Sequence, residues 1–444
     1  MHRIHKIILL IIAACALSAS AFAADNLQTP DQPEVLTLDN CLTIALQNSS
    51  DMKAAAQKVK IAEEQLRQAQ SGLWPTLGYE IAGANSDQNQ LAYGSVIGIE
   101  DSRKLSSASI SLTKPLYTGG QITQGIKGAK SNLEAVKEDE SKTRQTLIFN
   151  VKSAYYQVWL AQQMVKVAED SYENMGRHVE RVESFYEVGK ASKFDLLRAQ
   201  VEHANLKPNL IKAQNAVVLT KLNLANIIGI EKSRKFMVDY DLSKLQLPKQ
   251  IDLDAGTLVE QAYQQRPELR KLGELQKMAK AQTAMAYGGY KPTVALVGTY
   301  QGSSVGEYDP NNWDDTKQWI LTLDIKGNFF DGFQTPAKVG EAKANQKLVK
   351  ISEKSLRDGI DLDVEQSLQG LKESLETSFA NQANMNLAKE SLEMTEAKFE
   401  ARMATTIDIR DSQLALDQAL NGYYQGVSSY LTAVAKLDLA VGKE

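Results

Sequence analysis

Two stretches of the chain, 186–200 and 399–413, are versions of one element, and this repetition constrains the fold more than any other feature. They align at one constant offset, with these pairs: Tyr186 and Phe399, Ala191 and Ala404, Ser192 and Thr405, Asp195 and Asp408, Gln200 and Gln413. Each stretch lies between long segments of helical composition and carries the small, hydroxylic and acidic residues that end one helix and cap the next. We therefore predict that each is the tip of a helical hairpin.

The segments that precede the tips also repeat. A helix predicted over 39–71, capped by Asp39, aligns without a gap with a second helix predicted over 256–288, and Pro75 aligns with Pro292. A repeat of this length indicates duplication of one structural unit. We expect a first unit at 24–230 and a second at 256–444.

A change of hydrophobic period after each of these helices predicts a β-hairpin. Over 76–118 and 292–331, apolar residues alternate with small or polar ones, as in half-buried strands. The connections, at about 85–103 and 302–317, are polar and acidic and should be exposed loops. The chain thus has four predicted strands.

Four strands can be placed in two ways. They could form one sheet of a soluble sandwich, but no further strands are visible for a second sheet. They could instead form part of a membrane barrel, which needs at least eight strands. Three chains would supply twelve strands, and two chains would supply eight with a filled lumen.

The longest predicted helices, 121–187 and 334–400, each have about 67 residues and so span on the order of 100 Å. The returning helices, 193–228 and 407–441, are about half as long, so a returning helix and a strand-side helix stacked end to end would match a long helix. Both returning helices carry an apolar stripe with 4-3 spacing, which is typical of a left-handed coiled coil. The residues between the two units, 231–255, form a charged, proline-containing connector expected to lie outside at mid-height.

The first residues predict export from the cytoplasm. A basic start is followed by an apolar run and by a small-x-small site ending at Ala23, which together indicate a signal peptide at 1–23. Cys15 could alternatively be a lipidation site. Without the leader the net charge changes from −4 to about −6, and nothing in the composition suggests a nucleic acid partner.

The mature chain lacks the residues of common catalytic sites. It keeps one cysteine, Cys41, expected to be a buried small hydrophobe, and two histidines, His178 and His203. The two histidines could share a metal across the hairpin, although a solvated pair is the favoured interpretation. No zinc-hydrolase, Ser-His-Asp or Cys-His set is present, so we expect no enzymatic activity, no metal and no cofactor.

The order of helix, proline-led hairpin, long helix and tip, repeated twice, together with the tips VGKASKFDLLRAQ and MATTIDIRDSQ, resembles the TolC-type outer-membrane efflux proteins. The resemblance covers the chain from about residue 36 to its C-terminus. It implies an α+β membrane protein that forms a homotrimer, with a twelve-stranded β-barrel in the outer membrane and a coiled-coil helical tunnel in the periplasm. It also implies an exit duct for an inner-membrane pump of the RND, ABC or MFS type, or for a type I secretion system, joined through a periplasmic adaptor protein.

The resemblance also implies roles for residues at the tips. The aspartates that constrict the closed tip correspond to Asp408 and Asp411, and the acidic member of a latch between hairpins corresponds to Asp195. Phe399 and Ala404 replace the latch tyrosine and arginine of the family, and Arg402 replaces a tip glycine, so we include Arg402 in the gate as a possible partner of Asp195. The expected adaptor-docking residues are those at the exposed ends of the tips: Gly189, Lys190, Ala191, Ser192, Met403, Ala404 and Thr405.

Two other function classes stay open on the residues alone. A soluble periplasmic coiled-coil scaffold or adaptor would need no membrane strands. A secreted enzyme with helical appendages would need a catalytic constellation. The sequence names neither the cargo, which could be a small toxic compound, a metal ion or a protein, nor the class of pump.

Overall fold

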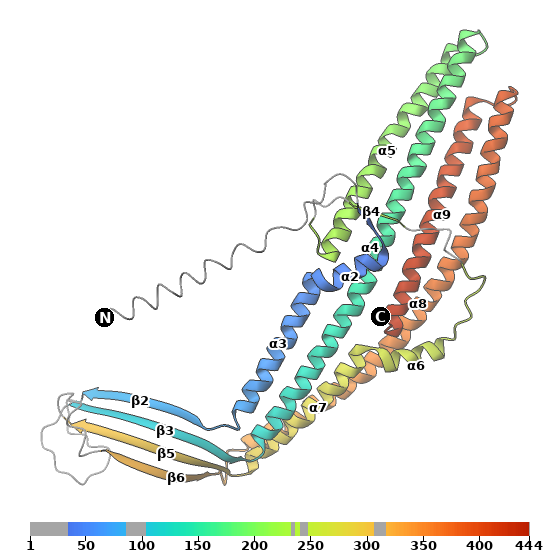
Figure 1. Cartoon of the computed structure of the whole chain (residues 1–444). Coiled ribbons are helices and arrows are strands. Elements are labelled where there is room, and N and C mark those ends of the chain that lie inside the picture. Colours follow the sequence, from blue (N-terminus) through green and yellow to red (C-terminus); the bar gives the residue numbers. More distant parts are fainter. Residues whose placement is uncertain (1–33, 86–103, 232–235, 240–246, 306–316, 444) are drawn as a thin grey trace, which may run out of the picture.

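The computed structural model describes residues 34–85, 104–231, 236–239, 247–305 and 317–443. The predicted leader with Cys15 and most of the two strand-connecting loops lie outside this part of the chain. The described chain is a long helical body with a sheet projecting from one end (Figure 1). The helical tips lie at the opposite end from the sheet.

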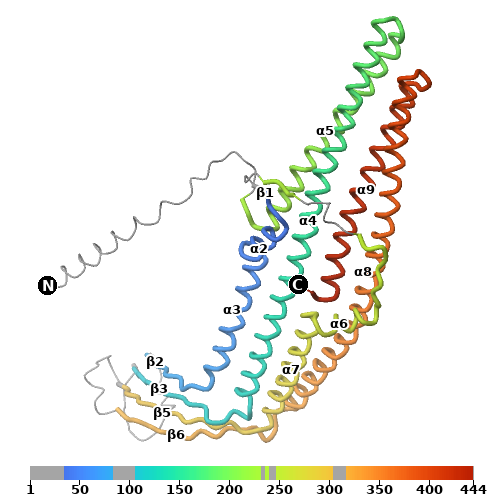
Figure 2. Tube along the Cα trace, turned by 45° about the vertical axis from the view of Figure 1, so that its right-hand side comes forward, coloured from blue at the N-terminus to red at the C-terminus, as the bar shows by residue number. Residues whose placement is uncertain are grey.

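Two long helical hairpins form the body. Helices α4 (Gln121–Glu187) and α8 (Gln334–Glu400) each have 67 residues. They are followed by α5 (Lys193–Ile228) and α9 (Thr406–Val441), each of 36 residues. These bounds confirm the prediction, except that α9 begins one residue earlier. The hairpins run side by side with both tips at the same end (Figures 1 and 2).

The returning helices pack through the stripes predicted from their 4-3 spacing. Every residue of both stripes is buried or half-buried: Leu206, Leu210, Ala213, Val217, Thr220, Leu224, Ile227, Leu416, Leu420, Tyr423, Val427, Tyr430, Val434 and Leu437. A seam of this period keeps one face of each helix against its neighbours along the whole length. None of the helices in the described residues is both long and apolar enough to cross a membrane.

The helices on the strand side are each broken once, whereas each was predicted to be continuous. The first consists of α2 (Leu38–Asn48) and α3 (Ser50–Ser71), and its N-cap is Thr37, not Asp39. The second consists of α6 (Ala255–Gln265) and α7 (Pro267–Tyr287), followed by a short 3-10 turn. Proline disfavours helical backbone in the residue before it, which explains the extended conformation of Arg266. At the first break, the Ser49 hydroxyl accepts a hydrogen bond from the Asp51 amide and starts a new helix.

The C-terminal end of a returning helix packs against each break. α5 is capped by Gly229, whose left-handed backbone packs so closely on the Asn48 carbonyl that a Cβ would lie 2.7 Å from the oxygen. At the second break, Arg266 pairs with Asp363 and donates a hydrogen bond of 2.5 Å from its Nε to the Ala440 carbonyl near the end of α9. The predicted end-to-end stacking is therefore confirmed, and a helix break marks each joint.

The main hydrophobic core lies at these joints, halfway along the body. Among its largest fully buried side chains are Tyr155 and Trp159 of α4. Two short parallel strands, β1 (Glu34–Leu36) and β4 (Phe236–Val238), cover it. The Tyr155 hydroxyl donates to the carbonyl of Asp239 at 2.7 Å and so ties the connector to the core. Cys41 is fully buried there, as predicted, and burial raises the pKa of its thiol to about 11.

The four predicted strands form one antiparallel sheet. Its order is β2 (Thr76–Asn85), β3 (Lys104–Thr118), β5 (Thr293–Val305) and β6 (Gln318–Lys326). β5 continues to Val305, so the predicted second loop begins about four residues too early. In the described chain β2 and β6 are the edges, each with an unpaired side.

The two faces of this sheet differ. The register aligns Tyr79, Ile110, Tyr300 and Trp319 in one row across one face, and Leu77, Leu112, Gly298 and Leu321 in the next row of that face. The opposite face carries a row of Glu80, Ser109, Gln301 and Gln318. Most large apolar side chains of the first face are more than half exposed to solvent, with Tyr79 at 82% and Trp319 at 77%. No helix covers this face in Figure 1.

Candidate functional site at the helical tips

The two tips have the same backbone turn. In the first, the Lys190 amide donates to the Phe185 carbonyl at 2.7 Å, and in the second the Met403 amide donates to the Lys398 carbonyl at 2.8 Å. One residue of each turn is left-handed, Gly189 with φ of 69° and Arg402 with φ of 61°. This is the usual way to close a helix, and it usually uses glycine because a Cβ is strained in that conformation.

A capping box starts the next helix at both tips. Ser192 and Asp195 exchange side-chain and backbone hydrogen bonds at the start of α5. Thr405 and Asp408 do the same at the start of α9, where the Asp408 carboxylate accepts from the Thr405 amide at 2.7 Å. The hydrogen bonds from Ser192 and Thr405 lower the pKa of Asp195 and Asp408, so both carboxylates are ionised.

Asp411 lies one turn after Asp408 on the same exposed side of α9, as the spacing predicted. Its carboxylate accepts hydrogen bonds from Arg410 at 2.8 and 3.0 Å. The same guanidinium reaches Glu202 of α5 at 3.2 Å and so connects the two hairpins. Arg410 therefore balances part of the acidic charge at this tip.

Between the tips lies a small apolar core. Val182, Leu196, Ala199, Phe399 and Ile409 form it, with residues from both hairpins. The Phe399 ring is its centre, because it packs on the His178 ring at 4.8 Å and on the Phe185 ring at 6.2 Å between centroids. These rings hold the end of α8 against α4.

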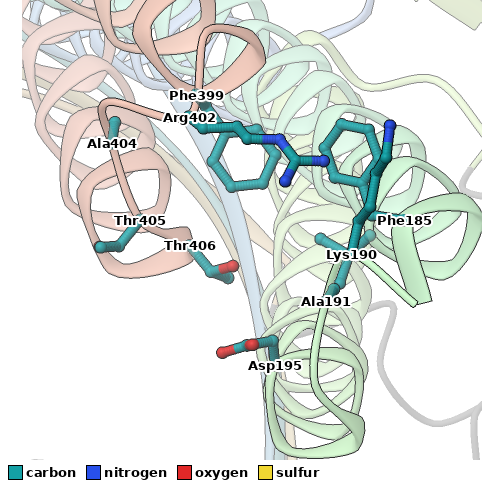
Figure 3. A pocket seen from close by; sticks show the side chains of 10 residues that line it. Phe185, Lys190, Ala191, Asp195, Phe399, Arg402, Ala404, Thr405 and Thr406 are labelled. Atoms are coloured by element: carbon teal, nitrogen blue, oxygen red, sulfur yellow. The ribbon is translucent and has the colours of Figure 1, made fainter. Parts of the chain in front are cut away.

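A cavity of about 250 Å³ opens beside this core (Figure 3). It is lined by Val182, Phe185, Lys190, Ala191, Asp195, Phe399, Arg402, Ala404, Thr405 and Thr406. The Arg402 guanidinium extends across it to the Phe185 ring, 5.5 Å from the centroid, whereas Asp195 lies at the opposite end near Thr406. Within one chain Arg402 thus contacts an aromatic ring, and its pairing with Asp195 of a neighbouring hairpin stays a prediction.

The cavity divides the predicted docking residues. Ala191 and Ala404 are half-buried and face the cavity. The others are exposed: Gly189, Lys190, Ser192, Met403 and Thr405. The tips thus present a polar outer surface over a small apolar interior.

The favoured interpretation of the two histidines as a solvated pair was wrong, because His178 is buried and His203 is half-buried. His178 is only 4% exposed, and burial together with nearby Arg181 lowers its pKa to about 4. The His203 ring packs on Tyr172 with 4.1 Å between centroids. His178 lies on the 4-3 stripe that contains Val182 and Phe185, a signal of burial that the sequence analysis missed. In the part of the chain that is described, no group of three or more His, Cys, Asp or Glu residues could hold a metal ion.

Comparison with known proteins identifies the family. The model of the outer membrane efflux protein family matches residues 41–230 and 258–443. The chain belongs to this family. Among curated relatives, the outer membrane protein TolC of Vibrio cholerae is 22% identical over 90% of this chain and 89% of its own length. The cation efflux system protein CusC of Escherichia coli is 22% identical over 92% of this chain and 82% of its own length.

Solved structures support the fold of this outer membrane efflux protein. A structure of CusC superposes with a TM-score of 0.78 at 17% identity, covering 95% of this chain and 96% of that one. The structure of VceC from Vibrio cholerae gives a TM-score of 0.75 at 16% identity, covering 91% and 96%. Two further matches are described as outer membrane channels, one from Campylobacter jejuni and one from Neisseria gonorrhoeae.

Family membership confirms the predicted resemblance, the role in efflux and the predicted location, the outer membrane with an extension into the periplasm. The relatives are channel proteins, which is consistent with the expectation that the chain is not an enzyme. A soluble scaffold, the alternative left open by the sequence, receives no support from these relatives. The chain is an outer-membrane efflux channel protein.

Proposed function

We propose that three copies of this chain form a closed duct, with a twelve-stranded barrel in the outer membrane and a helical tunnel in the periplasm. The observation that carries this proposal is the four-stranded sheet, which has two unpaired edges, an uncovered apolar face and a polar face. Edge pairing between chains satisfies β2 and β6, lipid covers the apolar face, and water fills the lumen along the polar face. One chain alone leaves all three surfaces unsatisfied.

The matched lengths of the helices support the predicted internal repeat. The two long helices both have 67 residues and the two returning helices both have 36. Six equivalent units in a trimer then make a continuous wall. The long helices carry this wall on the order of 100 Å from the sheet, far enough to reach partners deep in the periplasm.

The proposed role of the duct is to be the exit path of a tripartite efflux pump or of a type I secretion system. The exposed tips dock a periplasmic adaptor protein, which joins the duct to an inner-membrane pump of the RND, ABC or MFS type. This assignment is supported by the exposure of Lys190 and Met403 in the two turns, and by the position of the tips at the end of the molecule opposite the sheet. CusC is named as a cation efflux protein, but the cargo of this chain is not fixed by that likeness.

We place the gate at the same tips. In a three-fold assembly, Asp408 and Asp411 form two rings of carboxylates around the axis, and Arg402 of one hairpin approaches Asp195 of a neighbouring one. Rings of like charge concentrate cations, so the closed duct is cation-selective and binds multivalent cations. Arg410 reduces this field through its contact with Asp411.

Planar bilayer recordings test the gate. Asp408→Asn combined with Asp411→Asn should weaken cation selectivity and relieve block by trivalent cations. The exposed Asp358→Asn, on α8 away from the tips, is the matched control and should change neither. Unchanged selectivity and block in the double variant would contradict the gate and leave Asp408 as a helix cap and Asp411 as a partner of Arg410.

The assembly is tested by its mass. The chain extracted from outer membranes in mild detergent should have the mass of three chains, cross-linking should stop at three, and carbonate washing should leave it with the membrane. A monodisperse monomer, or release by carbonate, would contradict the proposed duct.

A further inference from the structure

A second cavity lies between the two hairpins, away from the tips, where α4, α5 and α9 meet. Its volume is about 520 Å³, and α4 runs between the other two helices (Figure 1). Most of its lining surface is apolar, with Met164 and Val167 from α4, Leu206 from α5 and Leu414 from α9. All three helices belong to one chain, so the cavity is complete without a second copy.

Asp417 of α9 brings one carboxylate to this apolar cavity. The Ser171 hydroxyl donates to its Oδ2 at 2.7 Å, and the Gln413 side-chain amide donates to its Oδ1 at 2.7 Å. The Asn174 amide donates to the Gln413 Oε1 at 3.2 Å, so the NH₂ group of Gln413 is held toward the carboxylate. Ser171 and Gln413 are themselves buried. This network fixes the position of the carboxylate and presents only donors to it.

The protein does not balance the charge of this carboxylate. In the described chain Asp417 forms no ion pair, and the charged group that acts on it is another carboxylate, Asp170 of α4. Burial, which is the larger cause, and this neighbouring charge raise the pKa of Asp417, although the hydrogen bonds from Ser171 and Gln413 oppose the shift. An ionised carboxylate has about four lone-pair sites, and the network occupies two of them. A cation in the cavity can therefore reach Asp417 and stabilise its ionised form.

The helical repeat does not require an acid at this position. Ala204 occupies the aligned position on the other returning helix, α5. An apolar residue of similar volume in place of a buried charge is often neutral or stabilising, so packing alone does not account for Asp417. A carboxylate in an otherwise apolar cavity instead has the composition of a ligand pocket, in which a few placed polar groups orient an apolar body.

The charges around the cavity favour a cation over an anion. One basic residue, Lys212 of α5, lines the cavity, and its side chain is exposed. Asp417 and the nearby Asp170 supply two carboxylates against this single ammonium group. The carboxylate of Asp417 is the more buried of the two, so solvent screens it less and it acts more strongly on a bound charge.

We propose that this cavity binds a hydrophobic organic cation, whose charged group lies against Asp417 and whose apolar body packs on Met164, Val167 and Leu206. The volume is within the range of about 300–1,000 Å³ that is usual for ligand pockets. The ligand contacts both hairpins about 16 Å from the start of α9, farther from the tip than the Arg410 contact with Glu202. It therefore links the hairpins at a second level. The inference depends on neither the proposed trimer nor the proposed barrel, because one chain forms the whole site.

Equilibrium dialysis of the purified full-length protein in mild detergent tests the site, with radiolabelled benzyltrimethylammonium as the probe. This ion carries a permanent charge and one aromatic ring, and it is soluble in water. The wild-type protein should bind one probe per chain in a saturable way. Asp417→Asn keeps the shape of the side chain and removes its charge, so the affinity should fall by about tenfold or more. Lys212→Gln removes a like charge and should raise the affinity by roughly twofold or more.

Three controls separate this site from the rest of the molecule. Asp358→Asn, at an exposed position on α8, should bind the probe as the wild type does. Asp408→Asn combined with Asp411→Asn should also retain binding, which distinguishes the cavity from the proposed gate. Benzoate, an anion with the same aromatic ring, should not bind.

Several outcomes would overturn the proposal. One is the absence of saturable binding to the wild-type protein, and another is equal binding by Asp417→Asn. Loss of binding in the double variant of Asp408 and Asp411 would place the cation at the tips. Benzoate binding that Lys212→Gln abolishes would make the cavity an anion site. If Asp417→Asn does not assemble, the exposed Lys212→Gln still decides, because unchanged or weaker binding of the probe by that variant contradicts a cation in this cavity.

Discussion

The two helical tips share one backbone and differ at its left-handed residue. In the first tip this residue is Gly189, and a Cβ built there would meet nothing within 4 Å. In the second it is Arg402, whose side chain extends to the Phe185 ring of the first hairpin. The first tip is therefore an open surface, whereas the second tip is fastened to the first hairpin. The same turn geometry thus gives an open surface where the left-handed residue is Gly189 and a contact between hairpins where it is Arg402.

The same contrast occurs at the other end of the molecule. In the described chain, the two residues other than glycine with positive φ are Phe333 and Arg402. They align with Gly120 and Gly189 of the first unit, which adopt the same conformation without strain. In both cases the second unit has a larger side chain where the first has an unstrained glycine: Phe333 packs on Phe330 of the same turn, and Arg402 reaches the Phe185 ring of the first hairpin.

The largest expected effect is the loss of export when the open first tip is substituted at Gly189. Gly189→Trp adds an indole to the surface where the adaptor is proposed to dock, so export should be lost while trimer and membrane insertion persist. Gly189→Asn is the control, because asparagine tolerates left-handed backbone and adds little bulk, and it should keep export. Efflux measured in a strain lacking the native protein tests both. Wild-type export by the tryptophan variant would remove the first tip from the docking surface.

The next effect concerns the core that fastens the second tip. Phe399→Ala removes the ring that contacts His178 and Phe185, and a truncation of this kind in a core typically costs about 3 kcal/mol or more. Hydrogen exchange of the backbone amides around both tips should accelerate by roughly a hundredfold or more. Phe379→Ala, on the same helix but 38% exposed, should change exchange far less. Equal acceleration in both variants would show that Phe399 has no special role.

Acid should loosen the same contact through His178. Burial lowers its pKa to about 4, so between pH 6.5 and 4 an opened tip binds a proton that the closed tip excludes. The neutral His178 ring contributes its full free energy to the closed tip above about pH 6.5. This contribution falls as the pH decreases, and at pH 5 it is lower by about 2 kcal/mol. Hydrogen exchange at the tips should therefore rise on acidification, and His178→Leu should remove this dependence. A pH response that persists in His178→Leu must come from another group.

The smallest expected effect compares the left-handed residues themselves. Arg402→Gly should relieve strain in the second turn by about 1 kcal/mol, and Gly189→Arg should introduce a similar cost in the first. Arg402→Gly also removes the contact with Phe185, so the turn becomes more stable while the two hairpins separate more easily. Exchange at the Met403 amide should slow as exchange in α4 near Phe185 accelerates. If exchange changed in the same direction at Met403 and near Phe185, Arg402 would not have separate effects on the stability of the turn and on the contact between the hairpins.

Much of this molecule could be predicted from local signals. The helix bounds were predicted closely because Gly120 and Gly332 mark the starts of the long helices, and the capping residues Ser192 and Thr405 mark the starts of the returning helices. The alternation of apolar residues placed Tyr79 and Trp319 on one face of the sheet. The break at Arg266 was missed although Pro267 signals it, because a proline at the first turn of a helix was taken as part of a continuous helix.

The candidate site could be predicted only in part, because its side chains meet through tertiary packing. The capping roles of Asp195 and Asp408 follow from spacing along one segment. The contact of Arg410 with Glu202 and the cavity beneath Arg402 join residues about 200 positions apart, and no local pattern records such contacts. The burial of His178 lies between these cases, since its stripe was present in the sequence but its polar side chain suggested a surface.

The proposed duct requires that one face of the sheet meets lipid and the other meets water, and two neighbouring substitutions test this requirement. Leu321 and Thr322 are both exposed in the single chain and point to opposite faces of β6. Leu321→Arg should cost roughly 2–4 kcal/mol in the bilayer and greatly reduce the trimer recovered from outer membranes, whereas Thr322→Arg should assemble at near wild-type yield. Equal recovery of the two variants would show that both faces are solvated and would contradict the proposed membrane barrel.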